Sequence, residues 1–176
     1  MKSDELRALQ APLKRAYRER PEAARITLRA TARLGEGLRC KVETGKGPVE
    51  AGLHPATGGD GSLACSGDML LEALVACAGV TLAAVATAIG IELRDARIHA
   101  EGDLDFRGTL GIDREVPVGF TEIRLCFDLD CDADAEGLAA LLKLTERYCV
   151  VYQTLRRGCT LRTEHRLDAS GDGNPG

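Results

Sequence analysis

Two cysteines, Cys77 and Cys149, have the residue type and placement that redox chemistry needs. Cys77 lies in the middle of an apolar stretch, residues 66–90. Cys149 follows Leu142 by seven residues, which keeps its thiol on the apolar stripe of a second predicted helix. If the two helices pack together, the thiols approach each other, and a disulfide then requires Cα atoms about 4.4–6.8 Å apart. Plain core packing fits the same pattern, because free cysteine is among the most buried residue types.

The stretch around Cys77 has the features of a long helix. Ser66 is a good N-cap, Asp68 lies in the first turn, and Gly90 is a suitable C-cap. A helix that is apolar on nearly every face is buried in a core or a membrane. Residues 73–89 are short for a span and rich in Ala and Thr. We therefore expect a core helix and no membrane association.

Composition bounds the class of protein. The 176 residues suit one domain with an appended arm, and the net charge of -4 comes from interleaved acidic and basic residues. No basic stripe indicates nucleic acid, and the 3% aromatic content disfavours base stacking. The start, MKSDELRALQ, lacks an apolar signal segment, and the seven cysteines are an odd number. We expect a cytoplasmic protein with reduced thiols, and no motif predicts a cofactor or metal.

The elements that must position the two thiols follow from periodicity. Residues 3–20 predict an amphipathic helix that ends at Pro21. Residues 25–34 alternate strictly, as a half-buried strand does, and continue through residues 38–42 as a hairpin, with a third strand at residues 49–53. Residues 92–106 and 120–130 predict a second, longer hairpin.

A second helix and a final strand complete the predicted domain. Asp132 or Asp134 caps this helix, which is expected to break just after Cys149 because Val150, Val151 and Tyr152 are β-branched or aromatic. Residues 159–166 predict a last strand. This order indicates an α+β fold with antiparallel sheets. We expect an N-terminal helical arm at residues 1–22, a domain at 23–168 and a disordered tail at 169–176.

Both cysteine segments resemble motifs of the OsmC/Ohr family of thiol peroxidases. The Cys77 helix is similar to the family pattern LLxALxxC through Leu70, Leu71, Ala73 and Leu74. The segment ERYCVVYQTL is similar to a CPVSxTL-like pattern through Val151, Thr154 and Leu155. The resemblance covers residues 25–166 and carries two motifs in the family's order and separation.

The resemblance implies both an assembly and a reaction. The assembly is an intertwined homodimer, with sheets from both chains around two central helices and active sites between the subunits. The reaction is reduction of organic hydroperoxides, with Cys77 as the peroxidatic thiolate, Cys149 as the resolving thiol and an external dithiol as reductant. An apolar pocket suits alkyl or lipid hydroperoxides.

Cys77 must ionise to react, and burial raises a thiol pKa. Because Cys77 lies far from the N-terminus of its own helix, we expect a cation nearby. The family supplies an Arg from the N-terminal strands, and Arg39 in GEGLRC is the best match, with Arg33 and Arg29 as alternatives. The family's Glu that holds this Arg falls at Gly67, so Asp68 is the expected substitute.

The sequence also departs from the family pattern after Cys149. Val150 and Tyr152 stand where the family usually has Pro and Ser. These departures and the missing Glu favour an alternative: an OsmC-fold protein with weak or no peroxidase activity that binds a small apolar ligand in the same pocket. A third interpretation is a cysteine-containing core without a redox role.

Overall fold

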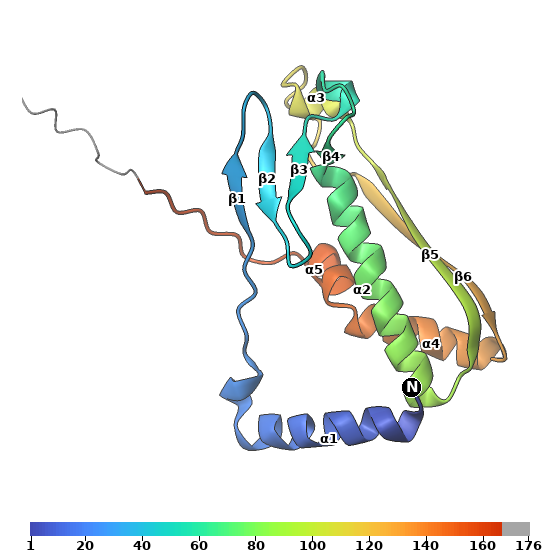
Figure 1. The fold of residues 1–176 in the computed structure, drawn as a ribbon. Coiled ribbons are helices and arrows are strands. Elements are labelled where there is room, and N and C mark those ends of the chain that lie inside the picture. The colour runs from blue at the N-terminus through green and yellow to red at the C-terminus, as the bar shows by residue number, and fades with distance from the viewer. Residues whose placement is uncertain (167–176) are drawn as a thin grey trace, which may run out of the picture.

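The computed structural model describes residues 1–166 and has an α+β architecture (Figure 1). Helix α1 and a 3-10 turn lead into a small four-stranded sheet, which is followed by the long helix α2. A two-stranded sheet, interrupted by the short helix α3, then leads to helices α4 and α5. The bounds are α1 Ser3–Glu19, η1 Pro21–Ala24, β1 Thr31–Leu34, β2 Cys40–Glu43, β3 Val49–Gly52, η2 Pro55–Thr57, β4 Ala64–Cys65, α2 Ser66–Ile89, β5 Leu93–Asp103, α3 Phe106–Thr109, β6 Glu122–Cys131, α4 Ala135–Tyr148 and α5 Val150–Arg157.

Both predicted hairpins are confirmed. In the first sheet, ordered β1-β2-β3-β4, β1 pairs antiparallel with β2, and Leu34 lies opposite Cys40. In the second sheet, β5 and β6 pair antiparallel over almost their whole length, with Ala96 opposite Leu129. The expectation of purely antiparallel sheets is wrong at one place, because the short pair β3/β4 is parallel. That pairing brings the chain to the start of α2.

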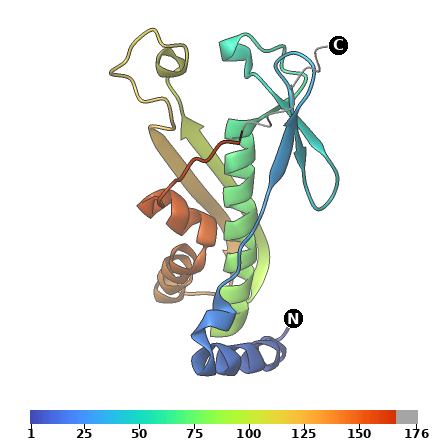
Figure 2. The same cartoon turned by 90° about the vertical axis from the view of Figure 1, so that its left-hand side faces the viewer.

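Helix α2 is the element around which the others are arranged. It runs between the first sheet and the β5–β6 hairpin, while α4 and α5 pack beside its lower half (Figures 1 and 2). Cys65 takes the N-cap position and Ser66 begins the helix, one residue earlier than predicted. Gly90 ends it with φ +79°, a left-handed conformation that glycine adopts without steric cost.

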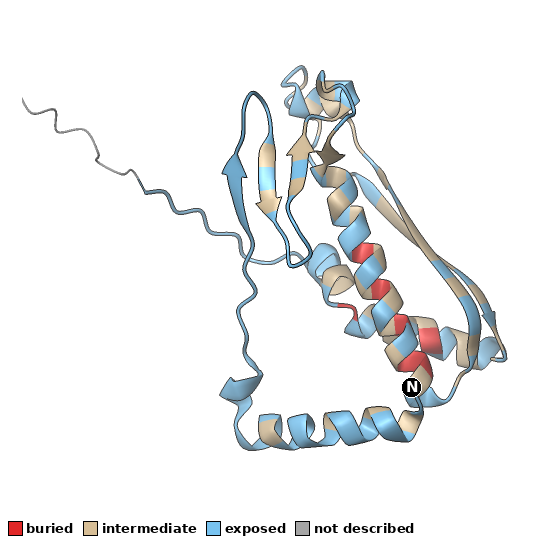
Figure 3. Ribbon diagram, in the orientation of Figure 1, coloured by how far each residue is buried: buried red, intermediate tan, exposed pale blue. Residues whose placement is uncertain are grey.

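The core lies on one side of α2. Leu82, Val85 and Ala86 pack against Leu141 of α4, and the inner face of the β5–β6 hairpin covers them. Figure 3 shows the buried residues as a row along α2 that faces α4 and the junction after it. The prediction that α2 is buried on nearly every face is wrong within one chain: Val80 is 75% exposed. In residues 1–166, α2 is the only helix long and apolar enough to cross a membrane. Its contacts are with α1, α4, α5, β4 and β5.

Two predicted strands differ from the structure. The first was expected at residues 25–34, but only Thr31–Leu34 forms a strand, since β2 offers four partners, and β1 is exposed throughout. The second, residues 159–166, forms no strand, because it pairs with no other segment of the described chain, and Leu161 is 87% exposed. The predicted tail at 169–176 lies outside the described residues.

Helices α1 and α4 agree with the sequence prediction, whereas α3 and α5 were not predicted. Helix α1 matches the predicted amphipathic arm and contacts α2, lying across the lower end of the molecule in Figure 1. Asp134 caps α4, and its Oδ1 accepts the Gly137 N–H at 2.8 Å. The expected break near Cys149 is confirmed, since α4 ends at Tyr148 and α5 begins at Val150.

Candidate functional site

Cys77 and Cys149 lie together where α2 meets the junction of α4 and α5. Cys77 is half-buried on α2, while Cys149 is only 1% exposed. The two thiols are close enough for each to shift the pKa of the other. The prediction that the two apolar stripes bring these cysteines into contact is therefore confirmed. In the described chain all seven cysteines are thiols, with no disulfide formed.

Cys149 is both the C-cap of α4 and the N-cap of α5. Its N–H donates to the Thr145 carbonyl at 2.9 Å and so closes α4. Its backbone then turns to φ -71° and ψ 112°, and its Sγ accepts the Tyr152 N–H at 3.5 Å as the N-cap of α5. This junction places the first turn of α5 against the Cys149 thiol.

The surroundings shift the two thiol pKa values in opposite directions. Burial acts to raise the pKa of Cys77, but hydrogen bonds from the Val151 N–H, the Cys149 thiol and the Val150 N–H outweigh it and hold this pKa below its usual value. Burial raises the pKa of Cys149, and the neighbouring Cys77 raises it further. Cys77 is therefore the thiol that ionises first, beside a partner that stays protonated.

Cys77 is far from the N-terminus of its own helix, and the cation expected beside it stays a prediction. A second helix, α5, begins at Val150, directly after Cys149. The sequence carried the signal: a predicted break at Cys149 starts a new helix, and its first N–H groups lie next to a cysteine that was expected to face Cys77. The spacing alone does not say which way that new helix points.

The structure of one chain does not bring Arg39 or Asp68 to Cys77. Arg39 precedes β2, lines a hollow with Asp60 and Gly52, and helps to hold the pKa of Asp60 low, after the larger effect of hydrogen bonds from Ser62. Asp68 lies in the first turn of α2 and lines a different hollow, beside His54 and Cys65. The roles predicted for both residues at Cys77 are therefore not seen within one chain.

A groove of about 440 Å³ lies between α2, α5 and the β5–β6 hairpin, and neither Cys77 nor Cys149 is among its lining residues. Leu74, one turn before Cys77, forms one wall, and Tyr152 and Leu155 of α5 form another. The remaining lining is Phe120, Thr121, Glu122, Ile123, Leu125, Phe127, Glu146 and Arg156. The Tyr152 hydroxyl donates to Glu146 Oε2 at 3.2 Å, which ties α5 to α4 across the end of the groove. The groove lining is thus mainly apolar, and its charged members are Glu122, Glu146 and Arg156.

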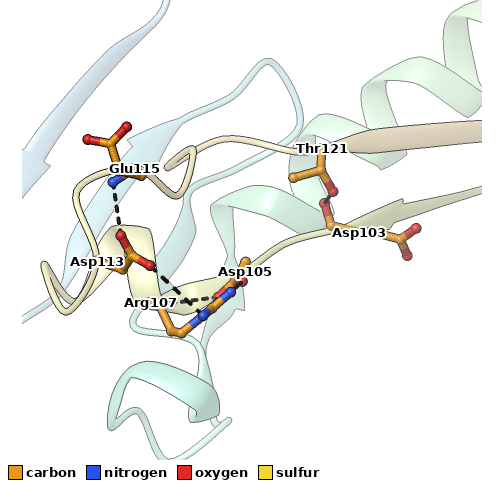
Figure 4. A network of polar contacts seen from close by, with 6 residues as sticks. All are labelled: Asp103, Asp105, Arg107, Asp113, Glu115 and Thr121. Atoms are coloured by element: carbon orange, nitrogen blue, oxygen red, sulfur yellow. Dashed lines mark hydrogen bonds and ion pairs between the residues drawn. The ribbon is translucent and has the colours of Figure 1, made fainter.

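A polar network supports the connection that carries Phe120 to the groove. Figure 4 shows Arg107 paired with Asp105 and Asp113, and the Glu115 N–H donating to Asp113 Oδ1 at 3.0 Å. The Thr121 N–H donates to the Asp103 carbonyl at 2.9 Å, where β6 begins. These bonds hold residues 103–121 in place, so that Phe120 lines both the groove and the neighbouring hollow.

The other candidate residues lie apart from the thiol pair. His54 stacks on Phe106 with ring centres 5.0 Å apart, and its Nδ1 accepts the Ala56 N–H. His99 lies on the outer face of β5, where its Nδ1 is 3.5 Å from Asp128 Oδ2. Within residues 1–166, no three His, Cys, Asp or Glu side chains are gathered as a metal site would require.

Comparisons with known proteins agree with this architecture. A model of the OsmC-like protein family matches residues 59–164. The OsmC-like protein of Mycoplasma pneumoniae superposes with a TM-score of 0.63 at 18% identity, covering 76% of this chain and 89% of that chain. An organic hydroperoxide resistance protein from Elizabethkingia anophelis gives 0.60 at 18% identity, covering 77% and 91%.

A third solved structure, the organic hydroperoxide resistance protein OhrB of Bacillus subtilis, gives a TM-score of 0.51 at 22% identity and covers 76% of this chain and 93% of that chain. At these identities the likeness shows the fold. A search of curated protein sequences finds no match.

Proposed function

The chain belongs to the family of OsmC-like proteins, and we propose that it is a thiol-dependent peroxidase that reduces organic hydroperoxides. The observation that carries the proposal is the pairing of Cys77, whose pKa is held low, with the buried Cys149, whose pKa is raised. A peroxidatic thiol must be a thiolate, while its resolving partner has to wait as a neutral thiol. Structural neighbours named as organic hydroperoxide resistance proteins support the same reading.

The reaction follows in two steps and a reset. The Cys77 thiolate attacks the terminal oxygen of ROOH, the O–O bond breaks, and the alkoxide takes a proton to leave as ROH, with Cys77 oxidised to a sulfenic acid. The Cys149 thiol loses its proton and attacks the Cys77 sulfur, which releases water and forms the Cys77–Cys149 disulfide. An external dithiol then reduces this disulfide and is itself oxidised.

The groove supports an apolar substrate. Leu74, Phe127 and Leu155 offer surface to an alkyl chain, and the groove begins one helical turn from Cys77. A hydroperoxide that carries such a chain gains free energy from burying it, whereas hydrogen peroxide has no chain to bury.

The roles proposed for Arg39 and Asp68 require a homodimer. We propose that Arg39 of the partner subunit approaches Cys77 and that Asp68 holds this guanidinium. Exposed apolar side chains on the segment that leads into β1, such as Leu28 at 84%, support a second subunit as the covering surface. A cytoplasmic location, where dithiol reductants keep the pair reduced, fits this chemistry.

Two observations favour a second candidate, in which the protein has weak or no peroxidase activity and binds a small apolar ligand. The position of the family's Glu is Gly67, and the groove alone is large enough to hold a small ligand. In this case the groove would bind the ligand equally well in Cys77→Ser.

Thiol counting separates the two candidates. Reduced protein mixed with cumene hydroperoxide is expected to lose two of its seven thiols per chain, and Cys77→Ser abolishes the loss. Cys149→Ser consumes peroxide once, and its Cys77 then over-oxidises to the sulfinic acid, which mass spectrometry detects. Cys159→Ser, at an exposed cysteine outside the site, is the matched control and behaves as wild type. If neither Cys77→Ser nor Cys149→Ser changes peroxide consumption, the peroxidase proposal is wrong.

A further inference from the structure

A second cavity, which we call the α4–α5 hollow, has a volume of about 610 Å³ and is lined only by residues of these two helices. Figure 2 shows α5 stacked on α4 beside α2. The lining contains four cations, Lys143 and Arg147 from α4 and Arg156 and Arg157 from α5. Its other members are Leu144, Gln153 and one carboxylate, Glu146. The α4–α5 hollow therefore has an excess of positive charge.

The four cations of the α4–α5 hollow are left without carboxylate partners. Within residues 1–166 none of them forms an ion pair, whereas Arg94, Arg107 and Arg124 each pair with an aspartate. Arg147 has its guanidinium carbon 5.5 Å from the centre of the Tyr148 ring, a contact that does not neutralise its charge. Carboxylates are not scarce in this chain, which has 27 acidic residues against 23 Lys and Arg.

The one carboxylate of the α4–α5 hollow is bonded elsewhere. The Tyr152 hydroxyl donates to Glu146 Oε2 at 3.2 Å, and Gln153 Nε2 donates to the Glu146 carbonyl at 2.8 Å. These two bonds tie α5 to α4, and they leave the cations to be neutralised by something outside the described chain.

Helix ends explain single cations but not this cluster. A cation in the last turn of a helix stabilises the partial negative charge there, and Arg147, Arg156 and Arg157 are in last turns. Lys143 lies before the last turn of α4. The helix dipole also gives no reason for two helices to place their cations around one cavity. An anion that binds in the cavity does give such a reason.

We propose that the α4–α5 hollow is a binding site for phosphate groups. Guanidinium groups donate paired hydrogen bonds that match the oxygens of a phosphate, and the lysine ammonium adds a compact charge. A phosphate monoester carries about two negative charges near neutral pH and a diphosphate carries more, so either offsets the excess charge better than a carboxylate does. The volume suits a small ligand. This inference goes beyond the proposed function and does not depend on it.

A phosphate in this position acts as a clamp between the two helices. The cations of α4 and those of α5 face a common space and repel one another until an anion neutralises them. The residue that joins the two helices is Cys149, the cap of both. Bound phosphate therefore holds the junction closed around a thiol that is only 1% exposed.

Titration calorimetry of the full chain with pyrophosphate tests the site. Arg147→Gln/Arg157→Gln removes one cation from each helix and is expected to weaken binding by at least about tenfold, because a lost charge-assisted hydrogen bond accounts for about that factor. Arg15→Gln/Arg18→Gln on α1 is the matched control, with the same change in net charge, and should bind as wild type. Sodium chloride at equal ionic strength controls for screening. No binding to wild type, or equal loss in the two variants, would overturn the site.

Vesicles distinguish the two sources of a phosphate group. Sedimentation with phosphatidylglycerol vesicles that Arg147→Gln/Arg157→Gln abolishes, and that Arg15→Gln/Arg18→Gln retains, supports the site with a lipid headgroup as its ligand. Pyrophosphate binding without sedimentation supports the site with a soluble phosphate compound. Sedimentation that both variants retain, together with no pyrophosphate binding, counts against the site.

Alkylation of Cys149 by iodoacetamide, located by peptide mass spectrometry in the reduced protein, tests the clamp. A thiol that is 1% exposed reacts only when the junction opens. Pyrophosphate at about ten times its Kd is expected to slow this reaction by up to about tenfold in wild type, and at the same concentration to have little effect in Arg147→Gln/Arg157→Gln. An unchanged rate at saturating pyrophosphate would overturn the clamp. None of these measurements uses peroxide, so their outcome is independent of the proposed peroxidase activity.

Discussion

At the scale of single residues, the surroundings shift the pKa values of two neighbouring thiols in opposite directions. Cys77 is half-buried yet gains N–H donors, while Cys149 is fully buried and lies against the thiol that ionises first. Two thiolates side by side would repel each other, so ionisation of one keeps the other protonated. This asymmetry is what distinguishes a nucleophile from a resolving thiol.

The asymmetry makes a prediction for Cys149. Burial is the main cause of its raised pKa, and Cys77 contributes both a hydrogen bond and a charge that raise it further. Cys77→Ser removes the charge, so the pKa of Cys149 should fall but stay above its ordinary value, because the burial remains. The 13Cβ chemical shift of Cys149, followed across pH, measures this without requiring access to the thiol. A midpoint that rises in Cys77→Ser would contradict the coupling.

At this scale the sequence predicted the pair but not the donors. The seven-residue step from Leu142 to Cys149 was enough to place both thiols on facing apolar stripes. The N–H groups of Val150 and Val151 were missed because backbone donors have no residue type, and their direction depends on the angle between α4 and α5. Periodicity gives the phase of each helix and leaves that angle open.

At the scale of elements, α2 and α4 form the rigid frame that brings the thiols together. Leu82 and Leu141 are at most 1% exposed and lie in one cluster. Thr145, buried between Leu141 and Cys149 on the same stripe, donates its hydroxyl to the Leu141 carbonyl at 2.8 Å. Packing in this cluster therefore sets the register between Cys77 and Cys149.

Leu141→Ala should weaken that frame. Removing a fully buried leucine side chain leaves a cavity and costs about 2–5 kcal/mol of unfolding free energy. Leu9→Ala, on α1 at a position 60% exposed, is the matched control and should change stability by less than about 0.5 kcal/mol. Urea unfolding at one protein concentration measures both. If Leu141→Ala is no more destabilised than Leu9→Ala, α4 does not carry the core.

The elements that sequence reasoning placed wrongly share a physical cause. Residues 25–34 alternate as a half-buried strand, and residues 159–166 have the composition of one, yet both are exposed in a single chain. An alternating pattern shows which side chains of a strand are apolar, but it does not show whether the surface that buries them belongs to the same chain or to another one. By contrast, the β5–β6 hairpin was predicted well, because its partner face, on α2 and α4, lies in the same chain.

At the scale of the whole molecule, the apolar surface left open is extensive. Ile26, Leu34 and Leu38 around the first hairpin are 74–89% exposed, and Val80 of α2 is 75% exposed. Scattered apolar residues are normal on a protein surface, but exposed apolar residues gathered around one hairpin are typical of an interface. In the proposed homodimer, a second copy of the chain would cover them and offer the same surface in return, as a closed twofold dimer requires.

Subunit mixing tests whether that dimer completes the site. If Arg39 of the partner subunit acts on Cys77, Arg39→Gln and Cys77→Ser are each weakly active or inactive alone. A mixed dimer restores one site, because the Cys77→Ser subunit supplies its Arg39 to the intact Cys77 of the other. Random exchange at equal amounts makes half of the dimers mixed, each with one intact site of two, so about one quarter of wild-type peroxide consumption should return. Mass in solution first establishes the dimer. No recovery after complete exchange would mean that Arg39 does not act across the interface.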